Sequence, residues 1–211
     1  MLAPPPATLA RGTLQTLAAG TQLHRLHDRA YAATSFNPGT SPSRSRFAPI
    51  RSATGQPIPT LYAAQTFECA AHETVFHDVV HGQPLKSMPL TRLEPLIHSV
   101  IAPAKDMNMV QLFEPDLNAW GLTRSDLIDT LPSGYANTAR WAEALHTANP
   151  DAHGLVWTSR RCDPGTAYLF FGDRLASGSL SSLSSTALTS SDAELRPVIG
   201  FGRRAGIGIT L

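Results

Sequence analysis

The alternation of apolar and polar residues along the chain predicts several short strands. Residues 21–27, TQLHRLH, alternate as a half-buried strand does, and residues 60–64 predict a second strand. Residues 86–113 indicate short strands separated by turns, and residues 154–172 indicate two strands joined by a turn at 163–165. Strands and helices do not alternate regularly, so the sequence favours an α+β fold in a single domain.

Two segments have the spacing of amphipathic helices. Thr66 is a good N-cap for a helix that we expect to run to about Val80, where Gly82 and Pro84 would end it. Residues 137–150 predict a second helix, and residues 117–130 short helical pieces. The expected inward residues of the 137–150 helix are Ala139, Trp141, Ala142 and Leu145.

The remaining segments are expected to be less regular. Residues 1–20 predict a loosely attached arm or a short first helix, with LQTLAA as the helical part. Residues 36–59 are rich in Pro, Gly and Ser and predict a long loop, which in a compact domain is usually functional or disordered. Residues 176–194 are Ser-rich and predict a flexible loop before a C-terminal strand. We therefore expect an arm (1–20), a main body (21–175), and a Ser-rich loop with a C-terminal strand of the same domain (176–211).

Composition and charge narrow the class of protein. A chain of 211 residues can bury one substantial core. A formal net charge of +1 argues against a general nucleic-acid binder, so no direct nucleic-acid binding is expected. No apolar run is long enough to cross a membrane, and the first residues lack the pattern of a secretory signal. The two cysteines, Cys69 and Cys162, do not make a disulfide scaffold, which favours a cytoplasmic location.

Glu73 is the residue that points most directly to chemistry. On a helix it falls on the apolar stripe, whose members would be Cys69, Ala70, Glu73, Phe76, His77 and Val80. A buried, unpaired carboxylate costs several kcal/mol, so Glu73 must be paired, protonated or facing a lined cavity. A structural salt bridge to a loop arginine and a substrate-facing role both satisfy this requirement.

The histidines around Glu73 do not form a recognisable metal motif. His72-Glu73 opens like H-E-x-x-H, but Phe76 stands where the second ligand belongs. On a helix, His72 and His77 would point about 140° apart. His77 and His81 have a suitable spacing but no evident third ligand. We therefore expect no metal, with His72 and His81 partly exposed and His77 hydrogen-bonded locally.

Two other segments come close to known motifs without matching them. PVIGFGRRAG (197–206) has one residue too many for the dinucleotide-binding glycine pattern, so it is interpreted as a glycine-rich turn. Ser159 lacks the flanking glycines of a nucleophile elbow, which argues against a serine hydrolase.

Arginines are grouped near these features. Their forked guanidinium groups suit phosphate oxygens, so together with Glu73 and Tyr62 they predict a pocket for a phosphorylated ligand with a ribose. The arginines in question are Arg25, Arg44, Arg46, Arg51, Arg160 and Arg161.

The ordered set LHR (23–25), SRF (45–47), LYAAQTFECAAHETVFHD (61–78) and GLVWTSRR (154–161) resembles the RES domain, named for its Arg, Glu and Ser. The resemblance spans roughly residues 20–175. It implies a fold like that of ADP-ribosyltransferase toxins and a toxin of a bacterial toxin–antitoxin pair that consumes NAD+. It also implies a helix-turn-helix antitoxin that blocks the active site.

Carried over residue by residue, the resemblance implies a site made of Arg25, Arg46, Tyr62, Glu73 and Ser159. Glu73 would stabilise the ribose cation as the nicotinamide–ribose bond breaks. Arg25 and Arg46 would bind the pyrophosphate or inorganic phosphate, Tyr62 would pack on nicotinamide or ribose, and Ser159 would hydrogen-bond the ribose or a phosphate. Trp157 could line the pocket, although a place in the core is favoured. The sequence departs from the family pattern at Ser45, where Gly is usual, and at Ala48, where Asn or Ser is usual.

The acceptor stays open. The resemblance implies phosphorolysis or hydrolysis of NAD+, which makes NAD+ the substrate, phosphate a possible co-substrate, and no cofactor necessary. One alternative is a mono-ADP-ribosyltransferase with a protein target. Another is a nucleotide-binding module that retains the pocket without the reaction.

Overall fold

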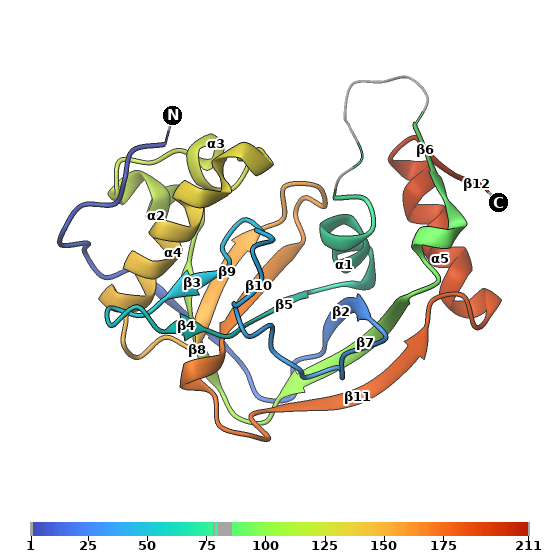
Figure 1. Cartoon of the computed structure of the whole chain (residues 1–211), viewed down its shortest axis with the longest axis horizontal. Helices are drawn as coiled ribbons and strands as arrows, with labels where there is room; N and C mark the ends of the chain where they lie inside the picture. Colours follow the sequence, from blue (N-terminus) through green and yellow to red (C-terminus); the bar gives the residue numbers. More distant parts are fainter. Residues whose placement is uncertain (1, 78, 80–85, 211) are drawn as a thin grey trace.

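The computed structural model describes residues 2–77, 79 and 86–210, and its main feature is one curved sheet with helices over two parts of it (Figure 1). The helices are α1 (Phe67–Thr74), α2 (Glu114–Ala119), α3 (Arg124–Leu127), α4 (Tyr135–Ala148) and α5 (Asp192–Arg204), with 3-10 turns at Leu90–Arg92, Pro132–Gly134 and Gly172–Arg174. The strands are β1 (Leu14–Leu17), β2 (Leu23–Asp28), β3 (Ile50–Arg51), β4 (Pro57–Ile58), β5 (Thr60–Ala64), β6 (Lys86–Pro89), β7 (Leu96–Pro103), β8 (Met107–Gln111), β9 (Gly154–Thr158), β10 (Thr166–Phe171), β11 (Leu180–Ala187) and β12 (Ile207–Thr210).

The order of strands in the main sheet creates an opening near its middle. Eight strands follow the order β1-β8-β9-β10-β5-β2-β7-β11, and β8 and β9 are its parallel neighbours. β2 and β5 pair only through His24 and Ala64, whereas β2 and β7 pair over six residues. The sheet therefore divides between β5 and β2, and side chains of both strands reach the space between them. The mixed sheet with helices confirms the α+β class.

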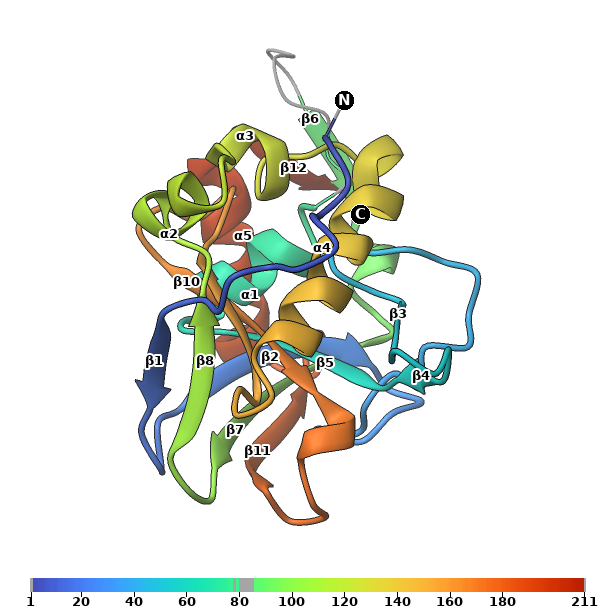
Figure 2. The ribbon, with the colours of Figure 1, turned by 90° about the vertical axis from the view of Figure 1, so that its left-hand side faces the viewer.

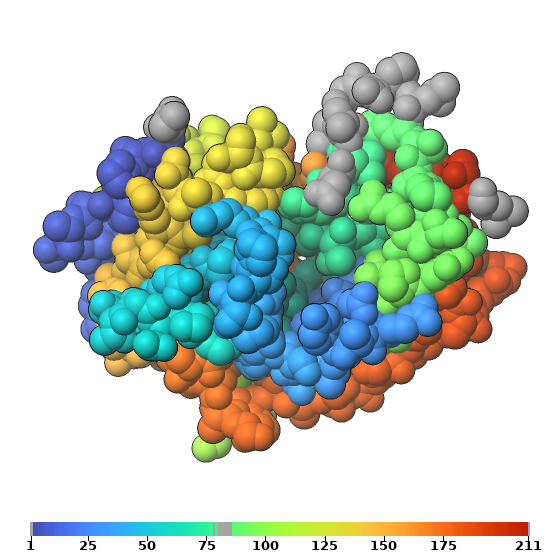
Figure 3. All heavy atoms as spheres, in the orientation of Figure 1, coloured from blue at the N-terminus to red at the C-terminus, as the bar shows by residue number. Residues whose placement is uncertain are grey.

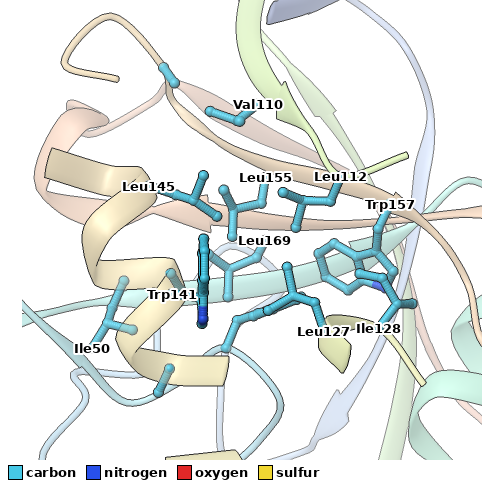
Figure 4. Close-up of a cluster of buried hydrophobic side chains, with 14 of the residues drawn as sticks. Ile50, Val110, Leu112, Leu127, Ile128, Trp141, Leu145, Leu155, Trp157 and Leu169 are labelled. Atoms are coloured by element: carbon cyan, nitrogen blue, oxygen red, sulfur yellow. The ribbon is translucent and has the colours of Figure 1, made fainter. Parts of the chain in front are cut away.

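One part of the core holds α2, α3 and α4 against β8, β9 and β10. Figure 4 shows Trp141 and Leu145 of α4 facing Leu155 and Leu169 of the sheet, and each of these side chains is at most 2% exposed. Burying a side chain of this size contributes about 1.5–3 kcal/mol. The predicted helix at 137–150 is therefore confirmed, with the expected residues inward.

A second helical group, α1 with α5, covers the other part of the sheet beside β2 and β7 (Figures 1 and 2). Phe76 and Val198 are completely buried between these elements. A Cβ on Gly202 of α5 would lie 3.2 Å from the Phe76 ring, so this glycine lets α5 pack closely. The interpretation of residues 197–206 as a glycine-rich turn was wrong for residues 197–204, which belong to α5, and a turn is formed only at Ala205 and Gly206. The C-terminal strand, β12, is confirmed.

Helix α1 begins as predicted and ends earlier. The Thr66 Oγ1 atom accepts a hydrogen bond from the Cys69 N–H at 3.1 Å, which confirms the N-cap. The helix ends at Thr74, and the Phe76 N–H bonds the Ala71 carbonyl, which closes the last turn. The expectation of a helix to about Val80 was therefore wrong, and Val80, Gly82 and Pro84 lie outside the described residues.

Two segments near the ends of the chain that were not expected to be strands form strands of the main sheet. Residues 14–17 form β1, an edge strand paired with β8, rather than part of a helix. Residues 180–187, inside the predicted flexible loop, form β11, paired with β7 through a bulge between Ser182 and Ser184. Most of the β11 side chains are exposed, so this strand is held by backbone hydrogen bonds rather than by burial.

Candidate functional site

A cavity of about 270 Å³ opens where β2 and β5 separate, under α1 and beside the 36–59 loop. Figure 3 shows the surface hollowed where the light-blue loop meets the green α1 segment. The lining residues include Arg25, Arg46, Tyr62 and Glu73, which are four of the five residues that the sequence singled out. Others are His24, Leu26, Asn37, Ser45, Thr60, Ala63, Ala64, Ala70, Thr74, His77, Trp157 and Ala167.

Glu73, near the C-terminal end of α1, is both paired and open to the cavity. Its Oε1 atom accepts a hydrogen bond from the Ser159 hydroxyl at 2.6 Å, and its Oε2 atom lies 3.5 Å from Arg46 Nη1. The Glu73 side chain keeps 17% of its surface exposed. Both interpretations of Glu73 therefore hold, because this partly buried carboxylate is paired and also faces a space large enough for a ligand.

Ser159 lies behind the carboxylate instead of in the cavity. It has no exposed surface and does not line the cavity. Its Oγ atom accepts hydrogen bonds from the Arg161 and Cys162 N–H groups, both at 3.2 Å, while its hydroxyl hydrogen goes to Glu73. The side chain of Arg124 donates to its carbonyl at 3.0 Å. Ser159 therefore orients Glu73, and this conformation leaves no room for the predicted contact with ribose or phosphate.

Tyr62 on β5 presents its ring to the cavity and uses its hydroxyl to hold the loop. The hydroxyl accepts a hydrogen bond from the Phe47 N–H at 3.0 Å and lies 3.0 Å from Ser45 Oγ. Burial raises the pKa of Tyr62 to about 12, so the phenol stays protonated at neutral pH. The unusual Ser45 thus supplies a hydrogen-bond partner that a glycine lacks.

Arg25 and Arg46 form the basic part of the cavity wall. Arg25 Nη1 donates to the carbonyls of Ala33 and Ser35 at 2.6 and 2.9 Å, which ties down the segment after β2. Burial lowers the pKa of Arg25 to about 10, so it remains charged at neutral pH. Arg46 is 4% exposed, and its buried Nε atom has no hydrogen-bond partner among the described residues. Both guanidinium groups therefore retain donors for a ligand.

The other arginines that the sequence grouped with this site do not line the cavity. Arg161 Nη1 donates to the carbonyls of Phe76 and Val79, and Arg160 Nη1 donates to the carbonyl of Thr130. Arg44 and Arg51 are exposed on the loop, outside this cavity. Arg161 supports the site indirectly, because it fixes the backbone that follows α1.

One of the histidines near Glu73, His72, differs from expectation. His72 is 6% exposed rather than partly open, and burial lowers its pKa. His77 lines the cavity, and its Nε2 atom lies 2.8 Å from the hydroxyl of Tyr135, a residue distant in the sequence. His81 lies outside the described residues. Within residues 2–77, 79 and 86–210, no three His, Cys, Asp or Glu side chains gather in an arrangement that could hold a metal ion.

Sequence reasoning missed several residues of the cavity wall. His24 and Asn37 were not singled out, although His24 stands beside Arg25 in the LHR segment and that position was a usable signal. Trp157 was not missed: the favoured core position and the alternative at the cavity wall both hold, because it is fully buried, lines the cavity and meets Tyr62 edge to face at 6.2 Å between centroids. No sequence signal identified Asn37.

Comparison with known proteins identifies the fold and the family. The RES domain family model matches residues 22–188, most of the chain. A chain of the crystal structure of the M. tuberculosis MbcT–MbcA toxin–antitoxin complex is similar, with a TM-score of 0.60 and 16% sequence identity. The match covers 88% of this chain and 92% of that one. No protein with curated annotation matches. No helix among the described residues is long and apolar enough to cross a membrane.

Proposed function

The chain belongs to the RES domain family, and from this premise we propose that it is a toxin that breaks NAD+ at the nicotinamide–ribose bond, by phosphorolysis or hydrolysis. We propose further that it acts in the cytoplasm and that a cognate antitoxin of the helix-turn-helix type neutralises it. The similarity to a chain of a toxin–antitoxin complex supports the antitoxin.

The observation that carries the proposal is the position of Glu73, a carboxylate held by two donors at the wall of a partly apolar cavity. Loss of nicotinamide leaves positive charge on the ribose, as in glycoside hydrolysis. A fixed carboxylate close to this charge lowers the barrier, and it does so more strongly in a space that excludes water. Because Ser159 and Arg46 already orient Glu73, little reorganisation is needed as the charge develops.

The size of the cavity suits one half of the dinucleotide. At about 270 Å³ it lies just below the roughly 300–1,000 Å³ typical of small-molecule pockets. The nicotinamide and its ribose would occupy it, and the adenosine half would lie outside. Arg25 and Arg46 on the wall would bind the pyrophosphate between the halves, or inorganic phosphate as the acceptor.

Tyr62 gives the cavity an aromatic surface for the flat nicotinamide ring, and the fully buried Trp157 supports it from behind. Tyr62 and Trp157 both line the cavity, and their rings are fixed by contact with each other and, for Tyr62, by the hydroxyl hydrogen bonds. Such rings contribute contact area with little loss of conformational entropy. Tyr62 therefore serves as a packing surface, and its protonated hydroxyl serves the loop.

The decisive experiment is an NAD+ consumption assay with identification of the products. Purified chain should convert NAD+ to nicotinamide and ADP-ribose, or to the phosphorylated ADP-ribose when phosphate is present. Glu73→Gln keeps the size of the side chain, but its single amide oxygen can accept only one of the two hydrogen bonds that Ser159 and Arg46 donate, and the negative charge is removed. We therefore expect a loss of about 100-fold or more in kcat.

Glu68→Gln is the matched control for Glu73→Gln. Glu68 is on the same helix, but it pairs with Arg204 at 3.0 Å and does not line the cavity. We expect it to retain near-wild-type activity. Soluble wild-type chain that leaves NAD+ intact during a long incubation would overturn the proposed function.

A further inference from the structure

A chain of three polar side chains leads from the cavity wall towards the surface. His24 Nδ1 on β2 lies 2.9 Å from His98 Nε2 on β7, and His98 Nδ1 lies 2.8 Å from Glu194 Oε2 on α5. The side chains of His98 and Glu194 are 10% and 22% exposed. Phe67 of α1 stacks on the His98 ring with 3.8 Å between centroids, which fixes the ring plane. Three elements far apart in the sequence thus meet in one hydrogen-bonded series.

This series determines which ring nitrogens carry hydrogen when both rings are neutral. A carboxylate only accepts hydrogen bonds, so the His98 hydrogen is on Nδ1 and its Nε2 atom is an acceptor. His24 must then donate through Nδ1, which leaves the His24 Nε2 atom with a free lone pair. Burial lowers the pKa of His24, which keeps the ring neutral near pH 7. Since His24 lines the cavity, Nε2 is the polar ring atom available to a molecule inside it.

We propose that His24 is the general base that activates water for attack on the ribose, and that His98 and Glu194 are positioning residues for it. The inference rests on the proposed function and assigns water as an acceptor. The arrangement follows the general pattern in which a base is oriented by a second group behind it.

The step balances without any further reactant. The water oxygen forms a bond to the ribose carbon while the carbon–nitrogen bond to nicotinamide breaks. The electron pair of the broken bond leaves with nicotinamide, which departs as a neutral molecule. The water proton goes to His24 Nε2, and the products are ADP-ribose, nicotinamide and one proton, which passes to solvent. The Nδ1–H bond to His98, which is backed by Glu194, stabilises the transient imidazolium. A phosphate dianion attacks through an oxygen that has no proton to lose, so phosphorolysis does not require this base.

Other ionisable groups around His24 influence its pKa and therefore the pH profile of NAD+ hydrolysis. Arg25, Arg46, Glu73, Tyr62 and His77 line the same cavity, His98 and Glu194 stand behind the ring, and α1 contributes the apolar Phe67. The charge of Glu194 raises the pKa of His24 against the larger effect of burial. Removing that charge should move the acid limb of the hydrolysis profile to lower pH.

The test compares hydrolysis with phosphorolysis in the full-length chain. We expect His24→Gln to reduce NAD+ hydrolysis in phosphate-free buffer by about 100-fold or more, and phosphorolysis at alkaline pH by less than about tenfold. Glu194→Gln should shift the acid limb of kcat to lower pH with little change in KM. His27→Gln is the matched control, because His27 lies on the same strand and bonds Ser99 of β7 at 2.8 Å but does not line the cavity.

The outcomes separate this inference from the proposed function. If the wild-type chain does not cleave NAD+, both the proposed function and the inference about His24 are wrong. Three results would contradict the inference alone. They are wild-type cleavage of NAD+ only with phosphate, unchanged hydrolysis in His24→Gln, and a loss of hydrolysis in His27→Gln equal to that in His24→Gln. Nitrogen-15 NMR of wild-type histidines gives a readout independent of activity and of variant folding: hydrogen on His24 Nδ1 supports the inference, and hydrogen on Nε2 alone overturns it.

Discussion

Replacement of Ser159 by alanine separates two roles for this serine. If Ser159 contacts NAD+, as the family resemblance implies, the change should raise KM. If it orients Glu73, as the 2.6 Å hydrogen bond and the absence of exposed surface indicate, the change should lower kcat with little effect on KM. The distinction is sharp because the serine hydroxyl has a single acceptor, the Oε1 atom of Glu73.

The expected magnitude follows from the type of bond. A hydrogen bond to a charged group contributes about 1.5–3 kcal/mol, which corresponds to a loss of roughly 10- to 100-fold in kcat. The substitution also leaves the Arg161 and Cys162 N–H groups without their acceptor. We therefore expect the free energy of unfolding to fall by about 1–3 kcal/mol.

The assay is steady-state NAD+ cleavage together with urea or thermal denaturation. Ser99→Ala is the matched control: Ser99 is also fully buried and bonds His27 and Ser185, but it does not line the cavity. It should lose stability and keep its kcat. In a Glu73→Gln background, Ser159→Ala should add much less than it does alone, because the two residues act as one unit. A raised KM at constant kcat, or full additivity, would refute the positioning role.

Two further predictions concern Tyr62 and the pH dependence of stability. Tyr62→Phe keeps the ring and loses the hydrogen bonds to Ser45 and Phe47, so we expect the unfolding free energy to fall by about 1–2 kcal/mol and kcat/KM to fall by less than about tenfold. Tyr62→Ala also removes the ring and should raise KM further. Equal kinetics for the two variants would contradict the packing role. Burial lowers the folded-state pKa of several histidines below the ordinary histidine value of 6.5, so the unfolded chain binds more protons than the folded chain as the pH falls. The protein should therefore lose stability as the pH falls from 6.5 through the lowered folded-state pKa values. Urea unfolding at pH 7.5 and at pH 5 measures this, and an equal or greater unfolding free energy at pH 5 would contradict it. The histidines concerned are His24, His27, His72 and His146.

Features of this protein that depend on near neighbours were predicted from the sequence. The Thr66 cap, the strand at 60–64 and the α4 face all arise within a few residues, where periodicity and capping chemistry act. Glu73 was identified for the same reason, because a carboxylate on an apolar helical stripe needs an explanation wherever the helix packs. The chemistry of the arginines and Tyr62 already grouped them with Glu73, and the family resemblance then selected Arg25 and Arg46 among the arginines. The structure brings these two and Tyr62 to the same cavity as Glu73.

Features that join distant segments were decided by the tertiary structure alone. β11 is a strand because the edge of β7 offers it backbone partners, and serines with exposed side chains carry no local sign of this. Ser159 lies behind Glu73, and His24 meets His98 and Glu194, only because the sheet and α5 bring these residues together. Hydrogen bonds between side chains about 70 to 100 positions apart leave no periodic pattern in the sequence, since their geometry exists only after the sheet has formed.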